Sequence, residues 1–252
     1  MGDVFNYPIP FFVALFCVFW AAAYAGVLVR GKTVLGDSER QELSTVLSAA
    51  LTLLALLIGF SFSMAAGRYD QRKNDEENEA NAIGTAYVRA GVLSPPEAAR
   101  ARELLRRYTG LRIVYYETRD SSRLAVNAGE TTQVQNDLWQ IAQAEARRHP
   151  TAVSALFASG INDVLNSQGY TQAAWWNRIP SEAWLLMVAM AVACSAIFGY
   201  LAQPGNGRAK RVFLIPAIVS IALFLIADLD SPRGGLIHVT AQNLESLQPS
   251  LH

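Results

Sequence analysis

Four long stretches without charge divide the chain, and a charged block separates them into two pairs. The uncharged stretches cover residues 4–29, 43–67, 183–207 and 212–227, and each is mostly apolar. A helix needs about 20 residues to cross about 30 Å of hydrocarbon. The first three stretches reach this length, whereas the fourth spans fully only if its ends enter the membrane interface. Because backbone groups in lipid must be satisfied within the segment, the pattern predicts four membrane helices.

The block between the two pairs is polar and predicts more helices. Residues 68–182 carry 14 basic and 14 acidic side chains. Apolar positions recur three and four residues apart, which is the spacing of one helix face, and no run predicts a strand. The fold class that we predict is an all-α membrane protein, with four transmembrane helices in a 2+2 arrangement and a central aqueous helical bundle. The helical runs are 80, 83, 84, 87; then 101, 104, 105, 108, 111, 115; then 134, 138, 141, 142; and finally 153, 156, 157, 161, 164, 165.

Boundaries follow from proline, glycine and capping residues. The second membrane helix has no proline after its span, so we expect it to run from about Leu43 to about Val92. Ser94-Pro95-Pro96-Glu97 predicts a capping box with proline at the first helical position. Residues 121–129 are interpreted as a loop, and His149-Pro150 as a helix end. The predicted domains are the helix pair 1–67, the aqueous bundle 68–182, the helix pair 183–229 and a tail 230–252.

Composition excludes several classes of function. The formal net charge is zero, so no nucleic acid is expected as a partner. No motif for a metal, a cofactor or a catalytic nucleophile is present, and we therefore expect neither a cofactor nor an enzyme. The acidic run Asp75, Glu76, Glu77 and Glu79 is interpreted as a solvated helix face, with a divalent cation site as the alternative. The cluster Arg100, Arg102, Arg106 and Arg107 is interpreted as a salt-bridged surface with Glu97 and Glu103.

The second uncharged stretch carries a row of side chains with a four-residue repeat. The row consists of Ser44, Ser48, Thr52, Leu56 and Phe60. Small and hydroxylated faces in membranes either pack against another helix or line water, and both interpretations are kept. We expect the row to face away from lipid.

Two carboxylates stand where the fourth stretch leaves the membrane. Asp228 follows only 16 uncharged residues, and Asp230 comes two positions later. A carboxylate near hydrocarbon must be paired or wetted. We expect Asp228 to be paired with Arg178 or Arg233, or to be exposed to water, and we expect it to matter more than Asp230.

Several motifs resemble a known family. Gly59-Phe60 is followed after seven residues by Arg68-Tyr69, a spacing that resembles the second membrane helix of bestrophins. Residues 79–81 (Glu-Ala-Asn) and the ending Asp-x-Pro-x-x-Gly-x-Ile-x-Val over residues 230–239 resemble the group described as bestrophin-like membrane proteins. That resemblance covers nearly the whole chain.

The resemblance carries an implied function. Bestrophins are pentameric anion channels whose second helix lines a narrow apolar neck, and this implies a neck at Thr52, Leu56 and Phe60. Thr52 and Leu56 stand where isoleucine and phenylalanine are usual, and Asp70 stands where tryptophan is usual. These departures bear on gating and selectivity.

Three classes of function follow. The first is a homo-oligomeric ion channel of the cell (inner) membrane, with an ion as ligand, pore-lining residues Ser48, Thr52, Leu56 and Phe60, and Arg68 favouring anions at the membrane edge. The alternative is a non-conducting scaffold or sensor whose bundle binds a partner protein, and a membrane enzyme is third.

Positive charges near the spans number six on one side of the membrane against five on the other. This count favours an extracytoplasmic bundle, whereas bestrophins keep the equivalent domain in the cytoplasm. The six are Arg30, Lys32, Arg40, Arg208, Lys210 and Arg211.

Overall fold

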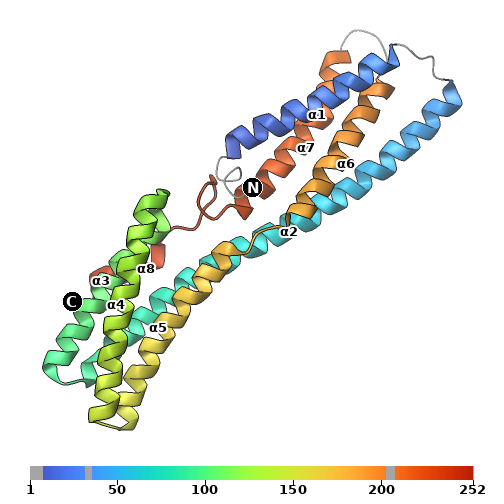
Figure 1. Ribbon diagram of the computed structural model, residues 1–252. Helices are drawn as coiled ribbons and strands as arrows, with labels where there is room; N and C mark the ends of the chain where they lie inside the picture. The colour runs from blue at the N-terminus through green and yellow to red at the C-terminus, as the bar shows by residue number, and fades with distance from the viewer. Residues whose placement is uncertain (1–7, 32–35, 203–207, 252) are drawn as a thin grey trace. The chain divides into compact units, whose positions relative to one another are not determined.

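The chain is helical throughout the part that the structure describes. A computed structural model describes residues 8–31, 36–202 and 208–251, and within them it contains no strand. The all-α prediction is therefore confirmed. Lys32 and the side chains of Arg208, Lys210 and Arg211, which enter the charge count of the sequence analysis, lie outside the described residues. The helices are α1 (Pro8–Arg30), α2 (Asp37–Arg89), α3 (Pro95–Glu117), α4 (Ser121–Arg148), α5 (Ala152–Trp176), α6 (Ser181–Leu201), α7 (Arg208–Asp230) and α8 (Gln242–Leu247), with short 3-10 turns η2 (Ala90–Val92) and η3 (Gln248–Ser250) (Figure 1).

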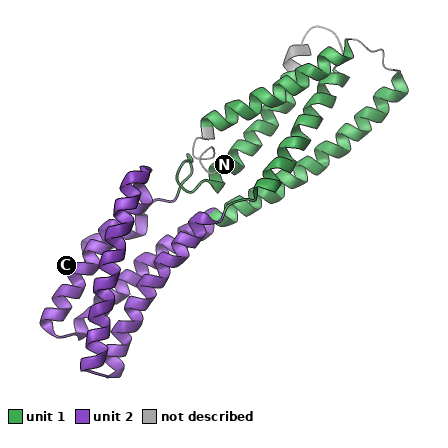
Figure 2. Cartoon of the chain, viewed as in Figure 1, with its two compact units in different colours: residues 1–68, 178–238 green, residues 69–177, 239–252 purple. Residues whose placement is uncertain are grey.

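The helices form two compact units, which Figure 2 colours separately. Residues 1–68 and 178–238 make up a membrane unit, and residues 69–177 and 239–252 make up an aqueous unit. Four helical segments are long and apolar enough to cross a membrane, which confirms the predicted number of spans. The fourth of them covers Val212–Asp230, so its helix continues beyond the uncharged stretch.

In the membrane unit, α1 packs against α6 and α7. Aromatic side chains fill part of these contacts. The ring of Phe16 on α1 lies 5.0 Å from that of Phe213 on α7, and Phe11 lies 5.7 Å from Trp184 on α6 in an edge-to-face arrangement. Such ring pairs stabilise a contact beyond the area that they bury.

Two glycines bring α1 and α6 together at their backbones. A Cβ added at Gly26 would lie 2.0 Å from the carbonyl oxygen of Ala196, and one added at Gly199 would lie 1.8 Å from that of Ala23. The requirement is reciprocal, since each helix places a glycine against the backbone of the other. Close approach through small residues is a principal source of helix association in membranes, where lipid is as apolar as the side chains.

The core of the aqueous unit is built from the predicted apolar faces. Ile83 and Tyr87 of α2 are buried together with Leu105 of α3, Leu138 of α4 and Ile161 of α5. The C-terminal segment adds its own apolar side chains to this core, namely Val239, Ala241, Leu244 and Leu251. The helical faces predicted for α2 and α4 are confirmed. On α5 the prediction was wrong for Val153 and Leu156, which are exposed because the helix turns Phe157 and Val164 inward.

Residues 121–129 are helical, so the predicted loop was wrong. The structure begins α4 at Ser121, where the Asp120 carboxylate accepts hydrogen bonds from the backbone N–H groups of Ser122 and Arg123. This is an N-cap, which compensates for the weak helix propensity of the polar residues that follow. Further along, the Asn127 side chain donates to the carbonyl of Leu111 on α3 at 2.9 Å.

Two other helix starts also differ from expectation. Helix α3 does begin at Pro95 after Ser94, but the Ser94 hydroxyl bonds the Glu97 carboxylate and makes no cap to a backbone N–H, so the capping box was wrong. Helix α2 begins at Asp37 rather than near Leu43, because Asp37 and Glu39 provide favourable negative charge in its first turn. Its other end, with η2 reaching Val92, agrees with the prediction.

The close approach of α1 and α6 can be tested by adding one methyl group. Gly199→Ala should lower the free energy of unfolding by roughly 1–3 kcal/mol or more, because the helices must separate to accommodate it. Gly110→Ala on α3 is the control, since its Cβ would meet nothing within 4 Å. The control should be neutral or slightly stabilising, by up to about 1 kcal/mol from helix propensity. Thermal unfolding followed by circular dichroism measures both, and equal melting temperatures would contradict the prediction.

Candidate functional site: the exposed face of α2 and the buried carboxylates

The predicted pore-lining row lies on an open face of α2. Ser48 and Thr52 are exposed, and Leu56 and Phe60 expose 53% and 61% of their surface. Leu56 and Phe60 are therefore not packed inside their own chain. Of the two interpretations, packing against another helix would therefore require a helix of another molecule, and otherwise the row is in contact with lipid or water.

The opposite side of α2 faces its own unit. Leu47, Leu54, Ser61 and Ala65 are buried, at intervals that place them on one helix face. Even so, α2 is the least buried of the four membrane segments. One face of α2 is thus buried within the chain, and most of the remaining surface of its membrane segment is exposed.

The hydroxyl groups on the exposed row are satisfied within the helix. The Ser48 hydroxyl donates to the carbonyl of Ser44 at 2.8 Å, and the Thr52 hydroxyl donates to that of Ser48 at 2.9 Å. Such bonds to the preceding turn are common for serine and threonine in helices. They remove one reason for keeping the row away from lipid, because these two hydroxyls need no external partner.

At the end of the membrane unit, Asp230 carries the ion pair that was expected for Asp228. The Arg68 guanidinium lies 3.0 Å from the Asp230 carboxylate. The same carboxylate accepts hydrogen bonds from the backbone N–H of Ile179 at 3.1 and 3.2 Å. Asp230 is only 6% exposed. Because its charge is paired, Arg68 is not the free cation that the sequence suggested, and the expected minor role of Asp230 does not fit its contacts.

Asp228 is buried and is satisfied by backbone groups, in place of the predicted Arg178 or Arg233. Its carboxylate accepts from the N–H of Leu236 at 2.7 Å and from that of Ile237 at 2.8 Å. Gly235 makes this turn possible, since an added Cβ would lie 2.7 Å from the Asp228 carbonyl oxygen. The glycine of the C-terminal motif thus has a physical role, which is to let the chain return onto this carboxylate, and Ile237 contributes its backbone N–H.

The Asp228 turn gives a prediction for a nearly isosteric change. Asp228→Asn keeps the shape but offers one acceptor oxygen to two N–H groups, so it should cost about 1–3 kcal/mol of stability. Asp70→Asn, at an exposed position of α2, should change stability far less. Melting temperatures of the two variants in detergent make the comparison, and an unchanged Asp228→Asn protein would show that the turn does not depend on this carboxylate.

In the aqueous unit, the acidic run is not a solvated face. Asp75, Glu76 and Glu79 are buried, and only Glu77 is exposed. The described residues hold no group of three side chains placed to bind a metal ion, so the cation alternative gains no support either. The error arose because the partners of these carboxylates lie on other helices and are remote in sequence.

Glu79 is the centre of a buried polar network. Its carboxylate forms an ion pair with Arg112 of α3, and both side chains are almost fully buried. Tyr116 donates to the same carboxylate at 3.2 Å, and Thr171 of α5 does so at 3.3 Å. Three helices are thereby joined through one carboxylate.

The protonation states of this network follow from its burial and its charges. Burial opposes the charge on Arg112, but the adjacent Glu79 carboxylate outweighs it and leaves the guanidinium pKa above its ordinary value. Burial, reinforced by the negative charge of Glu79, raises the pKa of the Tyr116 hydroxyl. Both groups therefore remain protonated at physiological pH, and the network keeps its ion pair and its donors.

Glu76 fixes the C-terminal segment to α2. Its carboxylate accepts from the backbone N–H of Asn243 at 2.9 Å and from that of Leu244 at 3.0 Å, and the Asn243 amide donates at 2.6 Å. These N–H groups belong to the first turn of α8, where a helix lacks internal partners. A carboxylate from a distant helix thus caps α8 and holds Leu244 in the core.

The basic cluster on α3 is partly the salt-bridged surface that was predicted. Arg106 pairs with Glu103 at 2.7 Å, as expected. The partner of Arg107 is Glu130 of α4, and the guanidinium of Arg102 lies 5.2 Å from the Tyr87 ring centroid.

The buried ion pair predicts a difference between single and double changes. Glu79→Gln leaves the Arg112 charge buried without its counter-charge and should cost about 3–5 kcal/mol. Replacing both partners, as Glu79→Leu with Arg112→Met, should be less destabilising than the single change, because no unpaired charge remains. Thermal unfolding of the three proteins provides the test. A double variant at least as unstable as Glu79→Gln would show that the pair is itself strongly stabilising.

Comparison with known proteins identifies the class that these features define. A family model, the Bestrophin-like domain, matches residues 13–244, and the chain belongs to this family. It is an integral, multi-pass membrane protein in contact with the lipid bilayer. A comparison with curated proteins gives no match.

Solved structures show the same fold. The bacterial bestrophin homologue from Klebsiella pneumoniae superimposes with a TM-score of 0.68 at 10% identity, covering 95% of this chain and 96% of that one. A single-substitution form of it gives 0.69 at 11% identity, with 95% and 97% covered. A structure described as a membrane protein variant gives 0.71 at 10% identity, with 95% and 96% covered.

Proposed function

We propose that the chain forms a homo-oligomeric ion channel in the cell inner membrane, lined by the Ser48, Thr52, Leu56 and Phe60 face of α2. The observation that carries the proposal is the exposure of this row on a helix whose other side packs into its own unit. Several copies of such a face can surround an axis and bury it in a ring. Membership of the bestrophin-like family supports the same assignment.

The row has the chemistry of a hydrophobic gate. Leu56 and Phe60 place an apolar segment one turn below Thr52 along the helix. A narrow apolar ring gates by dewetting, because water leaves it and an ion cannot enter without its hydration shell. The hydroxyls of Ser48 and Thr52 would line the wider, wetted part. Their bonds to the preceding turn leave oxygen lone pairs available to water.

In this proposal Arg68 is not the source of ion selectivity, although the sequence suggested that it would favour anions. Arg68 is paired with Asp230, so its net contribution to the potential at the pore exit is small. Arg68→Glu would replace the ion pair with Asp230 by two carboxylates facing each other and would disturb the fold, which makes it a poor test of ion choice. The reversal potential of the unmodified protein under a salt gradient measures selectivity directly.

The gate is tested by widening it. Leu56→Ala with Phe60→Ala should raise the flux of reconstituted protein about tenfold or more, or make it constitutive, because a wetted constriction no longer excludes ions. The matched control is Leu185→Ala with Leu214→Ala, two leucines on α6 and α7 that expose 72% and 56% of their surface. The control should leave flux unchanged.

Oligomeric state is measured on the same samples in nanodiscs. A ring of several copies together with increased flux in the gate variant supports the channel. A monomer with no flux in any variant, at any voltage or salt gradient tried, would refute it and favour the scaffold or sensor.

A further inference from the structure

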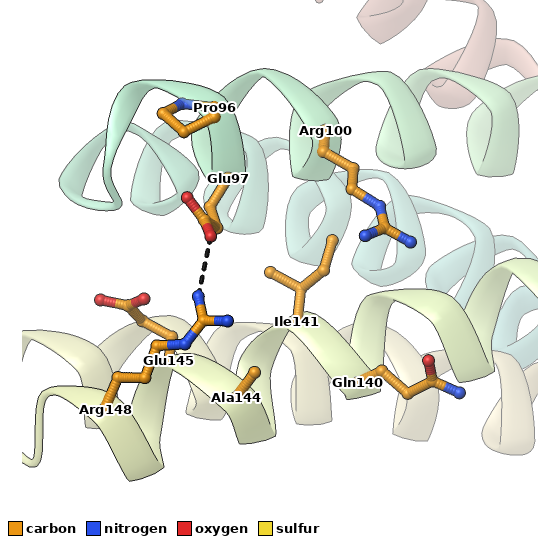
Figure 3. Close-up of a pocket in the computed structure, with 8 residues that line it drawn as sticks. All are labelled: Pro96, Glu97, Arg100, Gln140, Ile141, Ala144, Glu145 and Arg148. Carbon is orange, nitrogen blue, oxygen red and sulfur yellow. Dashed lines mark hydrogen bonds and ion pairs between the residues drawn. The ribbon is translucent and has the colours of Figure 1, made fainter.

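A pocket lies between the beginning of α3 and the end of α4, in the aqueous unit. Its volume is about 370 Å³, within the range of small-molecule sites. Figure 3 shows the residues that line it, with Glu97 and Arg100 on α3 facing α4. Gln140, Ile141, Glu145 and Arg148 contribute from α4.

Glu145 is the unusual member of this pocket. The residue is only 9% exposed. Among the residues that the structure describes, its carboxylate forms no hydrogen bond and no ion pair. The carboxylate oxygens of Glu145 are not among the fully buried polar atoms of the described residues that lack a partner, so they remain accessible in the pocket, whereas Glu79 and Glu76 are bonded to donors. Glu145 thus offers an unpaired carboxylate to a ligand in the pocket.

Among the other charged side chains that line the pocket, one cation forms no ion pair with the described residues. Glu97 and Arg148 pair with each other at 2.9 Å. The Ser94 hydroxyl, and after it Arg148, hold the pKa of Glu97 below its ordinary value, so Glu97 stays ionised. Arg100 forms no ion pair within residues 8–31, 36–202 and 208–251. In Figure 3 its guanidinium extends from α3 toward α4.

We propose that this pocket binds a small zwitterion, with an ammonium group at Glu145 and a carboxylate at Arg100. Each unpaired charge of the pocket then meets its opposite, and a charge-assisted bond forms at both ends. The side chain of Ile141 lies among the lining residues and offers an apolar contact for the methylene groups between the two charges. The Gln140 amide supplies further hydrogen-bonding capacity.

The charges argue against simpler ligands. A divalent cation would need Glu97 as a second carboxylate, but Glu97 is already bound by Arg148 and Ser94. An inorganic anion would meet Arg100 but would leave the Glu145 charge unpaired and repelled. Only a molecule with both signs of charge pairs both groups.

The experiment uses the full-length protein in detergent and a series of ω-amino acids, from glycine to ε-aminocaproate. Calorimetric titration should find saturable binding with an optimum at one chain length, because the separation of the two charges is fixed. Pentylamine and pentanoate each carry only one of the charges, so their affinity should be lower by a factor of about ten or more. Binding is measured without ion flux, so the result does not depend on the proposed channel.

Two variants and two controls assign the charges. Glu145→Gln and Arg100→Gln should each weaken the best amino acid by about tenfold or more. Glu77→Gln and Arg147→Gln, at exposed positions outside the pocket, should leave its affinity unchanged.

Each remaining outcome overturns the proposal. Absence of saturable binding for the whole series at millimolar concentration would do so. Undiminished affinity in either pocket variant would also do so.

Discussion

A carboxylate removed from water must be given donors, and four such groups organise the connections between helices in this protein. In the membrane unit, Asp228 holds the turn at Leu236 and Ile237, and Asp230 holds Arg68 and the segment before α6. In the aqueous unit, Glu79 joins three helices and Glu76 caps α8. Each group stands at a point where the chain changes direction or where helices meet. Satisfying them fixes the geometry of those points more strictly than apolar packing does, because hydrogen bonds are directional.

These contacts explain how α2 can keep its position while one of its faces stays exposed. The buried side of α2 ends near Arg68, whose pairing with Asp230 ties the end of that span to the end of α7. The helix is thus held by its buried side and by its end, while the row through Leu56 and Phe60 makes no such contact. A helix anchored in this way can present one face to a partner copy without losing its place in its own chain.

Much of the fold could be predicted from sequence, for reasons that are local. Uncharged length predicts a membrane helix, and the spacing of Ile83 and Tyr87 predicts a buried face, because both depend only on nearby residues. The contacts of Glu79 could not be predicted, since Arg112 is 33 positions away and an acidic run in isolation is typical of a solvated surface. The start of α4 was missed for a related reason. Its polar residues are poor helix formers, and only the Asp120 cap together with Asn127 shows why the helix forms.

The glycine contact between α1 and α6 also constrains how the protein is made. Gly26 and Gly199 are separated by most of the chain, yet each requires the backbone of the other helix. During synthesis, α1 enters the membrane long before its partner exists, and it must wait among lipids, or beside the insertion machinery, until α6 emerges. The membrane unit is therefore completed late, and truncation before α6 would leave α1 with its glycine face open to any other helix nearby. The glycine face of α1 is therefore protected from contact with other helices only after α6 has been translated and inserted.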